Sequence, residues 1–218
     1  MQQSENNFIY MLVALVIYLV GVPAATDLDL LPAGVVRAIG TLSILAIGVW
    51  SLQGSGRTFP VAISLALIAI VLSGYQIVNP GTALYSMAQL TSLAFFLLAT
   101  FTSFRKIASS NAMNGNRIIG AICVYFLLGV VWSVCYELLE FAVPGSFSGL
   151  DAGSALPQDP NWVYFSFVTL TTLGYGDILP LSGFARALAY MEAVFGQFYI
   201  AILVAGLVSA YIANKQAS

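Results

Sequence analysis

The feature that most constrains the fold is a series of long apolar stretches separated by short polar connectors. A helix needs roughly 20 apolar residues to cross a bilayer core of about 30 Å, and six stretches are close to or above that length. They are approximately residues 8–25, 33–52, 59–78, 82–104, 117–143 and 183–214. Because lipid cannot satisfy backbone amides and carbonyls, such stretches must be helical. We predict an all-α integral membrane protein with six transmembrane helices.

The overall composition supports the same class. Apolar residues make up 60% of the 218 residues, charged residues make up 7%, and histidine is absent. Soluble domains carry about 25% charged residues, so this chain lies far outside their range. The net charge of -2 gives no reason to expect nucleic acid as a partner. No basic segment precedes the long first stretch, so we do not expect a cleavable signal peptide.

The positions of the charged residues predict an orientation. If the amino terminus is cytoplasmic, most basic residues fall on the cytoplasmic side, namely Arg57, Arg105, Lys106, Arg117 and Lys215, with Arg37 and Arg186 as exceptions. Both termini are then cytoplasmic. The outer side receives Asp27, Asp29, Asp151, Asp159 and Asp177. An acidic outer surface concentrates cations, although for Asp27 and Asp29 we favour simple solvation of a loop.

Residues 171–177 read Thr-Thr-Leu-Gly-Tyr-Gly-Asp, and this segment resembles the selectivity filter of potassium channels. In that family, backbone carbonyls replace the hydration shell of K⁺. Successive carbonyls can face one axis only if the backbone alternates in handedness, which Gly174 and Gly176 allow because they lack a Cβ. A loop with two glycines by chance is the alternative, but agreement at seven ordered positions argues against it.

The resemblance implies roles for residues 172–176, which would bind K⁺ through main-chain oxygens. Thr172 can add its hydroxyl at the inner mouth, whereas Leu173 and Tyr175 are expected to point away from the ion into protein. Selectivity would then reside in carbonyl oxygens rather than in side chains. No other cofactor is implied.

The segment before the motif reads as a short helix. Asp159 is placed to cap it, Pro160 fits its first turn, and residues 162–172 would form it. It is too short to cross a bilayer, so we predict a re-entrant pore helix whose negative carboxyl end faces the inner mouth. The stretch at 183–214 is then a full transmembrane helix.

The motif occurs once in the chain, yet a ring of carbonyls around an axis needs four copies. We therefore expect a homotetramer with the pore on its fourfold axis. The polar connector at residues 105–116 divides the chain into a four-helix module, residues 1–108, and a pore module, residues 109–218. The family resemblance is specific over residues 117–218 and only architectural before them.

Three further positions follow from the resemblance by counting from the motif. Tyr164 stands where relatives have an aromatic donor to the aspartate after the filter, here Asp177; an ordinary interfacial tyrosine is the alternative. Val168 replaces a carboxylate that some relatives place behind the filter. Gly196 falls on the hinge glycine of the inner helix, although a small residue for close helix packing explains it equally well.

The fourth stretch has no charged residue between positions 82 and 104, so strong voltage gating by that helix is not expected. One acid, Glu192, lies inside the sixth stretch and must have a partner or a proton. The candidate partners are the hydroxyls of Ser166, Thr169 and Thr171, and the contact could be structural or could regulate gating. Glu137 and Glu140 are expected to face the aqueous rim.

The sequence predicts a K⁺-selective channel in a lipid bilayer, and the resemblance suggests a bacterial inner membrane. The alternative is a regulatory or sensor subunit that keeps the pore fold but needs a partner to conduct. A separate cytoplasmic regulatory partner is possible in either case. No nucleophile stands beside a general base, so an enzyme has little support. Cys123 and Cys135 lie in one predicted helix and cannot bridge each other.

Overall fold

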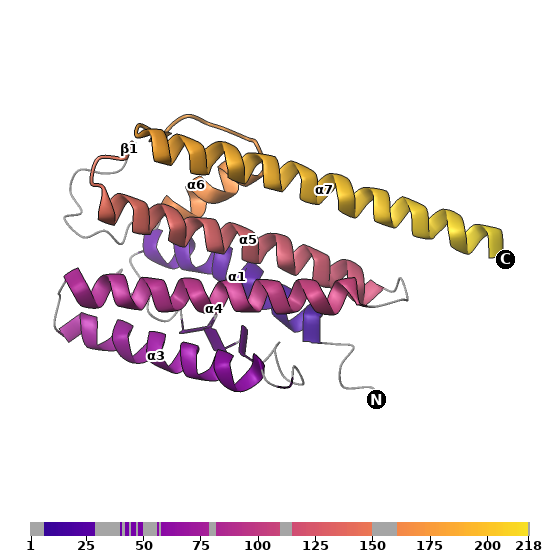
Figure 1. The fold of residues 1–218 in the computed structure, drawn as a ribbon, viewed down its shortest axis with the longest axis horizontal. Coiled ribbons are helices and arrows are strands. Elements are labelled where there is room, and N and C mark those ends of the chain that lie inside the picture. Colours follow the sequence, from indigo (N-terminus) through magenta and orange to yellow (C-terminus); the bar gives the residue numbers. More distant parts are fainter. Residues whose placement is uncertain are drawn as a thin grey trace.

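The computed structural model describes residues 7–28, 40, 42–43, 45–46, 48–49, 56, 58–78, 82–109, 115–149 and 161–217. Within these residues the chain is almost entirely helical (Figure 1). The helices are α1 (Asn7–Asp27), α3 (Thr58–Val78), α4 (Thr82–Ala108), α5 (Gly115–Ala142), α6 (Asn161–Leu170) and α7 (Gly183–Ala217). Two short strands, β1 (Phe147–Ser148) and β2 (Leu179–Pro180), pair in antiparallel orientation.

Four of the described helices are long and apolar enough to cross a membrane, and they lie in α1, α3, α4 and α5. Each coincides with a stretch predicted from the sequence. At 1.5 Å per residue, the 35 residues of α7 extend over about 50 Å, which is more than one crossing requires. The predicted stretch at 33–52 lies largely outside the described residues, and the residues described within it have helical backbone.

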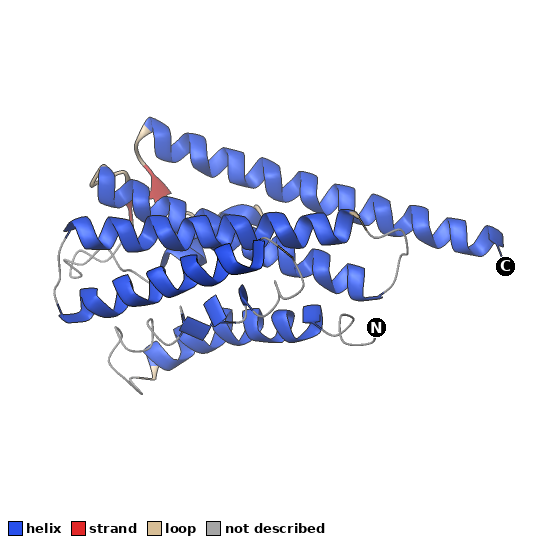
Figure 2. Cartoon of the chain, turned by 60° about the horizontal axis from the view of Figure 1, so that its bottom comes forward, coloured by secondary structure: helices blue, strands red, loops and turns tan. Residues whose placement is uncertain are grey.

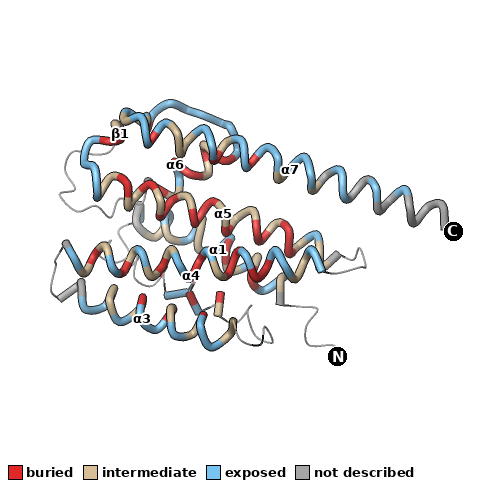
Figure 3. Tube along the Cα trace, viewed as in Figure 1, coloured by how far each residue is buried: buried red, intermediate tan, exposed pale blue. Residues whose placement is uncertain are grey.

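Helix α5 is the central element of the described fold. It packs against α1, α4, α6 and α7, whereas α3 packs against α4 at the edge of the bundle (Figure 1). Burial follows this order, since 56% of the apolar window in α5 is buried but only 11% of the window in α1 and 17% of that in α3 (Figure 3). Apolar helices with so little protein around them require lipid as their solvent.

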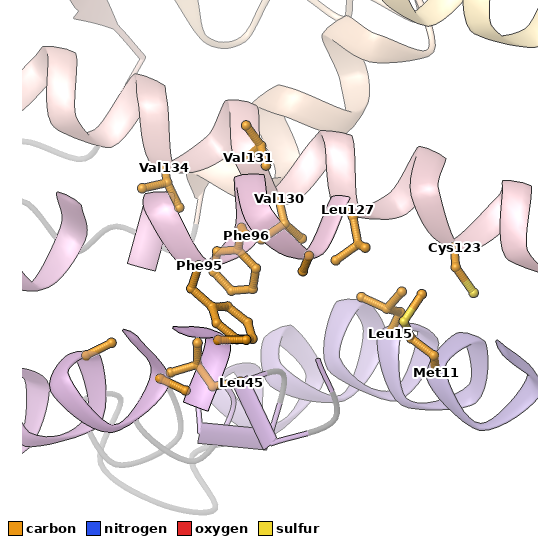
Figure 4. Packing of buried hydrophobic residues seen from close by; sticks show 14 residues of the cluster. Met11, Leu15, Leu45, Phe95, Phe96, Cys123, Leu127, Val130, Val131 and Val134 are labelled. Carbon is orange, nitrogen blue, oxygen red and sulfur yellow. The ribbon is translucent and has the colours of Figure 1, made fainter. Parts of the chain in front are cut away.

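A core of small and branched apolar side chains joins α1, α3, α4 and α5. Phe95 of α4 is fully buried beside Leu45, while Leu127 and Val130 of α5 lie toward α1 and α4 (Figure 4). Alanines at positions 62, 66 and 69 give α3 a small-residue face in this core. Small residues allow close approach of helices in a membrane, where the hydrophobic effect between helices is weak.

A second core is largely aromatic and surrounds α6. The ring of Phe165 lies 4.8 Å from that of Tyr136 and 5.5 Å from that of Phe147, and Trp162 lies 5.0 Å from Phe147, as centroid distances. Edge-to-face ring pairs of this kind each stabilise packing by about 0.5–1.5 kcal/mol beyond burial. The core fixes α6 between α5 and the β1–β2 pair, so the segment that follows α6 leaves from a rigid support.

Two helix ends and one strand pair differ notably from the sequence predictions. Helix α4 continues to Ala108, so the first residues of the predicted connector at 105–116 are helical. Helix α6 ends at Leu170 rather than at residue 172, because Thr171 and Thr172 form a turn. The β1–β2 pair was not predicted, since strands of two residues leave no alternation in the sequence. Asp159 and Pro160, the predicted start of α6, lie outside the described residues.

Several helix ends lie at one end of the bundle. The start of α1, the end of α4 and the start of α5 lie there, and α7 extends beyond this end to its carboxyl terminus (Figures 1 and 2). Arg105 and Lys106 close α4 at this end, and Arg117 opens α5 there. The strand pair lies at the opposite end. The three basic residues at these two helix ends therefore share one side of the molecule.

Candidate functional site

Residues 171–177 form the connection from α6 to β2. All seven are exposed in the single chain, in contrast to the buried α6 residues that precede them (Figure 3). The loop runs past α7 on the side of the molecule away from α3 and α4 (Figure 1). The core of the subunit therefore supports this segment without covering it.

The backbone of the segment alternates in conformation. The φ angle is 58° at Thr172, 60° at Gly174 and 81° at Gly176, while Leu173 and Tyr175 keep ordinary negative φ. Positive φ was expected at the two glycines, but Thr172 was missed. It is the one non-glycine residue with positive φ among the described residues. A β-branched residue in this region is strained, and such strain concentrates at functional sites.

The last turn of α6 anchors the start of the segment through its carbonyls. Val168 O accepts hydrogen bonds from the amides of Leu173, at 2.9 Å, and Gly174, at 3.3 Å. Thr172 N donates to Thr169 O at 2.9 Å. The apolar side chain of Val168 is buried. At this position the backbone rather than the side chain contacts the segment.

The carboxyl-terminal end of the segment is held by a tyrosine. Tyr164 Oη donates to Asp177 Oδ2 at 2.5 Å, and its ring stacks on Tyr175 at 6.5 Å between centroids. The hydrogen bond from Tyr164 lowers the pKa of the Asp177 carboxyl, and the backbone amide of Ile178 acts in the same direction. The tyrosine contact suggested by counting from the motif is present.

The amino-terminal end of the segment meets α7. Gln197 Nε2 donates to Thr172 Oγ1 at 3.3 Å, a contact that the sequence did not indicate. Gly196 packs directly on the end of α6, because a Cβ at this position would lie 2.2 Å from Leu170 O. Close packing therefore accounts for this glycine, and α7 is continuous through it. A hinge at Gly196 remains a prediction.

Glu192 lies behind the segment and is fully buried. Its Oε1 is 2.5 Å from Ser166 Oγ, so one of the predicted hydroxyl partners is correct. Thr171 instead donates to Phe167 O. The second partner is Tyr136, whose hydroxyl donates to Glu192 Oε2 at 2.5 Å. Tyr136 is 56 residues away in the chain, and no sequence signal links the two.

The two acids near the carboxyl end of α5 hydrogen-bond to other parts of the protein. Glu140 accepts hydrogen bonds from the amides of Gly145, at 2.7 Å, and Phe147, at 3.1 Å, and so holds the turn that leads to β1. Glu137 accepts a hydrogen bond from Tyr85 of α4. Both side chains are half-buried, and the expectation that they face the aqueous rim stays a prediction. Sequence position near a helix end does not reveal contacts with another element.

Comparison with known proteins agrees with this geometry. Residues 120–213 match the protein family described as "Ion channel". The matched region contains most of α5, all of α6, the exposed segment and most of α7. The first four predicted transmembrane stretches lie outside it.

Several curated potassium channels are similar to the chain. "Two pore potassium channel c" of Oryza sativa subsp. japonica is 38% identical over 77 residues, which are 34% of this chain and 16% of that protein. "Inward rectifier potassium channel Kirbac3.1" of Paramagnetospirillum magnetotacticum is 32% identical over 76 residues, 35% of this chain and 22% of that protein. The chain thus covers less than a quarter of either relative. No solved structure matches the chain.

Proposed function

We propose that this protein conducts K⁺ passively across a membrane, because residues 120–213 match the family described as "Ion channel" and the similar proteins are named potassium channels. Residues 172–176 are the proposed ion path and bind K⁺ through main-chain oxygens.

The observation that carries the proposal is the alternation of φ in residues 172–176. A peptide with ordinary φ throughout turns successive carbonyls to different sides, whereas alternation of handedness can bring them to one side. Gly174 and Gly176 adopt this backbone without a Cβ penalty. Val168 O accepts hydrogen bonds from the amides of Leu173 and Gly174 at the start of the segment. The arrangement suits a dehydrated monovalent cation.

We propose a homotetramer as the conducting assembly. The motif occurs once in the sequence, and one chain leaves the whole segment exposed. Four chains around an axis would supply the ring of carbonyls and surround the exposed segment with protein. The mass of the protein in nanodiscs tests this assembly, and a conducting monomer or dimer would contradict it.

We place the helix ends that carry Arg105, Lys106 and Arg117 in the cytoplasm, because basic residues are retained on that side. Helix α7 extends beyond the same end of the bundle (Figure 1). Asp177 then lies at the outer mouth, where its negative charge attracts cations. A bacterial inner membrane is the proposed location.

Flux measurement with the purified protein in liposomes tests the function. K⁺ uptake into sealed vesicles should exceed Na⁺ uptake under equal gradients, and protein-free vesicles give the background. Uptake of both ions at equal rates would contradict selectivity. A tetramer that passes neither ion would favour the alternative of a regulatory subunit that needs a partner.

A further inference from the structure

Three helices meet at a buried polar group behind residues 171–177. Glu192 of α7, Ser166 of α6 and Tyr136 of α5 are each 0% exposed. Tyr136 Oη lies 2.5 Å from Glu192 Oε2, and Ser166 Oγ lies 2.5 Å from Glu192 Oε1. Ser166 Oγ also lies 2.7 Å from the carbonyl oxygen of Gly129 in α5. These three short contacts lead from Tyr136 of α5 to Glu192 of α7, on to Ser166 of α6, and back to Gly129 of α5.

The three contacts need three hydrogens, and this requirement fixes the protonation state of Glu192. An ionised Glu192 brings none, so only the hydroxyls of Tyr136 and Ser166 contribute, with one hydrogen each. Two hydrogens cannot serve three contacts, because one hydrogen shared between two acceptors lengthens both contacts, whereas the contacts of Ser166 are 2.5 and 2.7 Å. With an ionised Glu192, one of the two Ser166 contacts would contain no hydrogen, and its two acceptor oxygens would face each other.

A neutral Glu192 brings the missing hydrogen. It donates from Oε1 to Ser166 Oγ, Ser166 donates to Gly129 O, and Tyr136 donates to Glu192 Oε2, so each contact contains one hydrogen. The surroundings favour this state, because a buried charge without a counter-ion is costly. The ionisable groups that face Glu192 are Tyr125, Cys135 and Tyr136 of α5. In the described part of the chain no lysine or arginine contacts it.

We propose that Glu192 is held as a neutral carboxylic acid whose proton positions α6 behind the ion path. This inference rests on the proposed function only for the role of residues 172–176. Ser166 lies two residues before Val168, whose carbonyl holds the amides of Leu173 and Gly174. The Glu192 proton fixes Ser166 between α7 and α5, and Ser166 fixes the turn that carries Val168. Glu192 is therefore a positioning residue.

Infrared spectroscopy of the purified full-length protein at neutral pH tests the protonation. We expect a carbonyl stretch of a protonated carboxylic acid that is lost in Glu192→Gln. The band should be kept in Glu137→Gln, which removes a half-buried acid of α5 that also contacts a tyrosine. Tyr136→Phe should shift the band to higher frequency, because the carbonyl oxygen loses its donor. If Glu192→Gln fails to assemble, Tyr136→Phe alone decides. A wild-type spectrum without such a band overturns the inference. So does a band that is unchanged in both Glu192→Gln and Tyr136→Phe.

Flux measurements test the positioning role. The amide of Glu192→Gln can donate to Ser166 while its carbonyl accepts from Tyr136, so this variant should retain K⁺ flux. Glu192→Ala should lose most of it, and flux equal to wild type in Glu192→Ala would overturn the positioning role. The two proposals fail separately: a band without any K⁺ flux contradicts the proposed function, whereas flux without a band contradicts the neutral acid.

Discussion

At the scale of single residues, Gly176 gives the sharpest test of the ion path. Its φ of 81° lies in a region that a residue with a Cβ adopts only at a cost of about 1–2 kcal/mol. Within the described residues nothing lies within 4 Å of an added Cβ, so the effect of Gly176→Ala is on the backbone. We expect this variant to lose K⁺-selective flux in liposomes while it still folds.

Gly183→Ala is the matched control for that experiment. Gly183 begins α7, has ordinary φ and also has no atom within 4 Å of an added Cβ. The Gly183→Ala variant should conduct like the wild-type protein. Unchanged selectivity in Gly176→Ala would show that residues 172–176 are not the ion path.

The hydrogen bond between Tyr164 and Asp177 predicts how the current depends on external pH. Because Tyr164 donates to the ionised carboxyl and lowers its pKa, the wild-type charge persists to lower pH than that of an ordinary aspartate. The contact is lost as the pH falls through this lowered pKa. Tyr164→Phe removes the main cause of the shift, so the loss of current on external acidification should move to higher pH.

Recordings at a series of external pH values measure this shift. Tyr190→Phe, which removes an exposed hydroxyl from α7, is the control and should keep the wild-type profile. A shift to lower pH in Tyr164→Phe would contradict the assigned role of the hydrogen bond.

The residues that sequence reasoning located are those with local signals. Gly174 and Gly176 are visible because only glycine reaches positive φ freely, and Glu192 is visible because a charge in an apolar stretch is rare. Tyr136 and Gln197 were missed because each contacts its partner across 56 and 25 residues, respectively. A tyrosine or glutamine in an apolar helix has no pattern that identifies its partner, since the contact depends on the packing of three helices.

At the scale of elements, the contact between α6 and α7 depends on Gly196. An added methyl group would lie 2.2 Å from Leu170 O, and backbone at both positions prevents easy relief. Overpacking of this kind costs about 1–3 kcal/mol. We therefore expect Gly196→Ala to lower the thermal stability of the protein in detergent and to reduce flux.

Gly206→Ala in the same helix separates packing from helix propensity. No atom lies within 4 Å of an added Cβ at Gly206, so alanine should be neutral or stabilise α7 by up to about 1 kcal/mol. If Gly196→Ala keeps full stability but stops conduction, the hinge explanation would replace the packing explanation.

Four of the predicted membrane-crossing helices are present in the described residues, and they were predictable because each apolar stretch has the length of a bilayer crossing. The end of α6 and the β1–β2 pair were not. The residue types at Thr171 and Thr172 do not mark a helix end. The helix nevertheless ends there, because Val168 O accepts hydrogen bonds from the amides of Leu173 and Gly174. Propensity cannot reveal a helix end that the following loop imposes.

At the scale of the whole molecule, α4 predicts how the protein responds to voltage. In the proposed orientation α4 crosses the membrane, yet it carries no charge between Thr82 and Phe104, and its bases Arg105 and Lys106 lie in its last turn. One charge moved through 100 mV yields about 2.3 kcal/mol, and steep gating needs several such charges. Glu192 adds none if it is neutral. Planar-bilayer recordings should therefore give a shallow conductance-voltage relation, and Glu192→Gln should have the same slope. A steep relation equivalent to many charges would require a sensor elsewhere in the assembly, and a slope that disappears in Glu192→Gln would show that this carboxyl carries charge in the field.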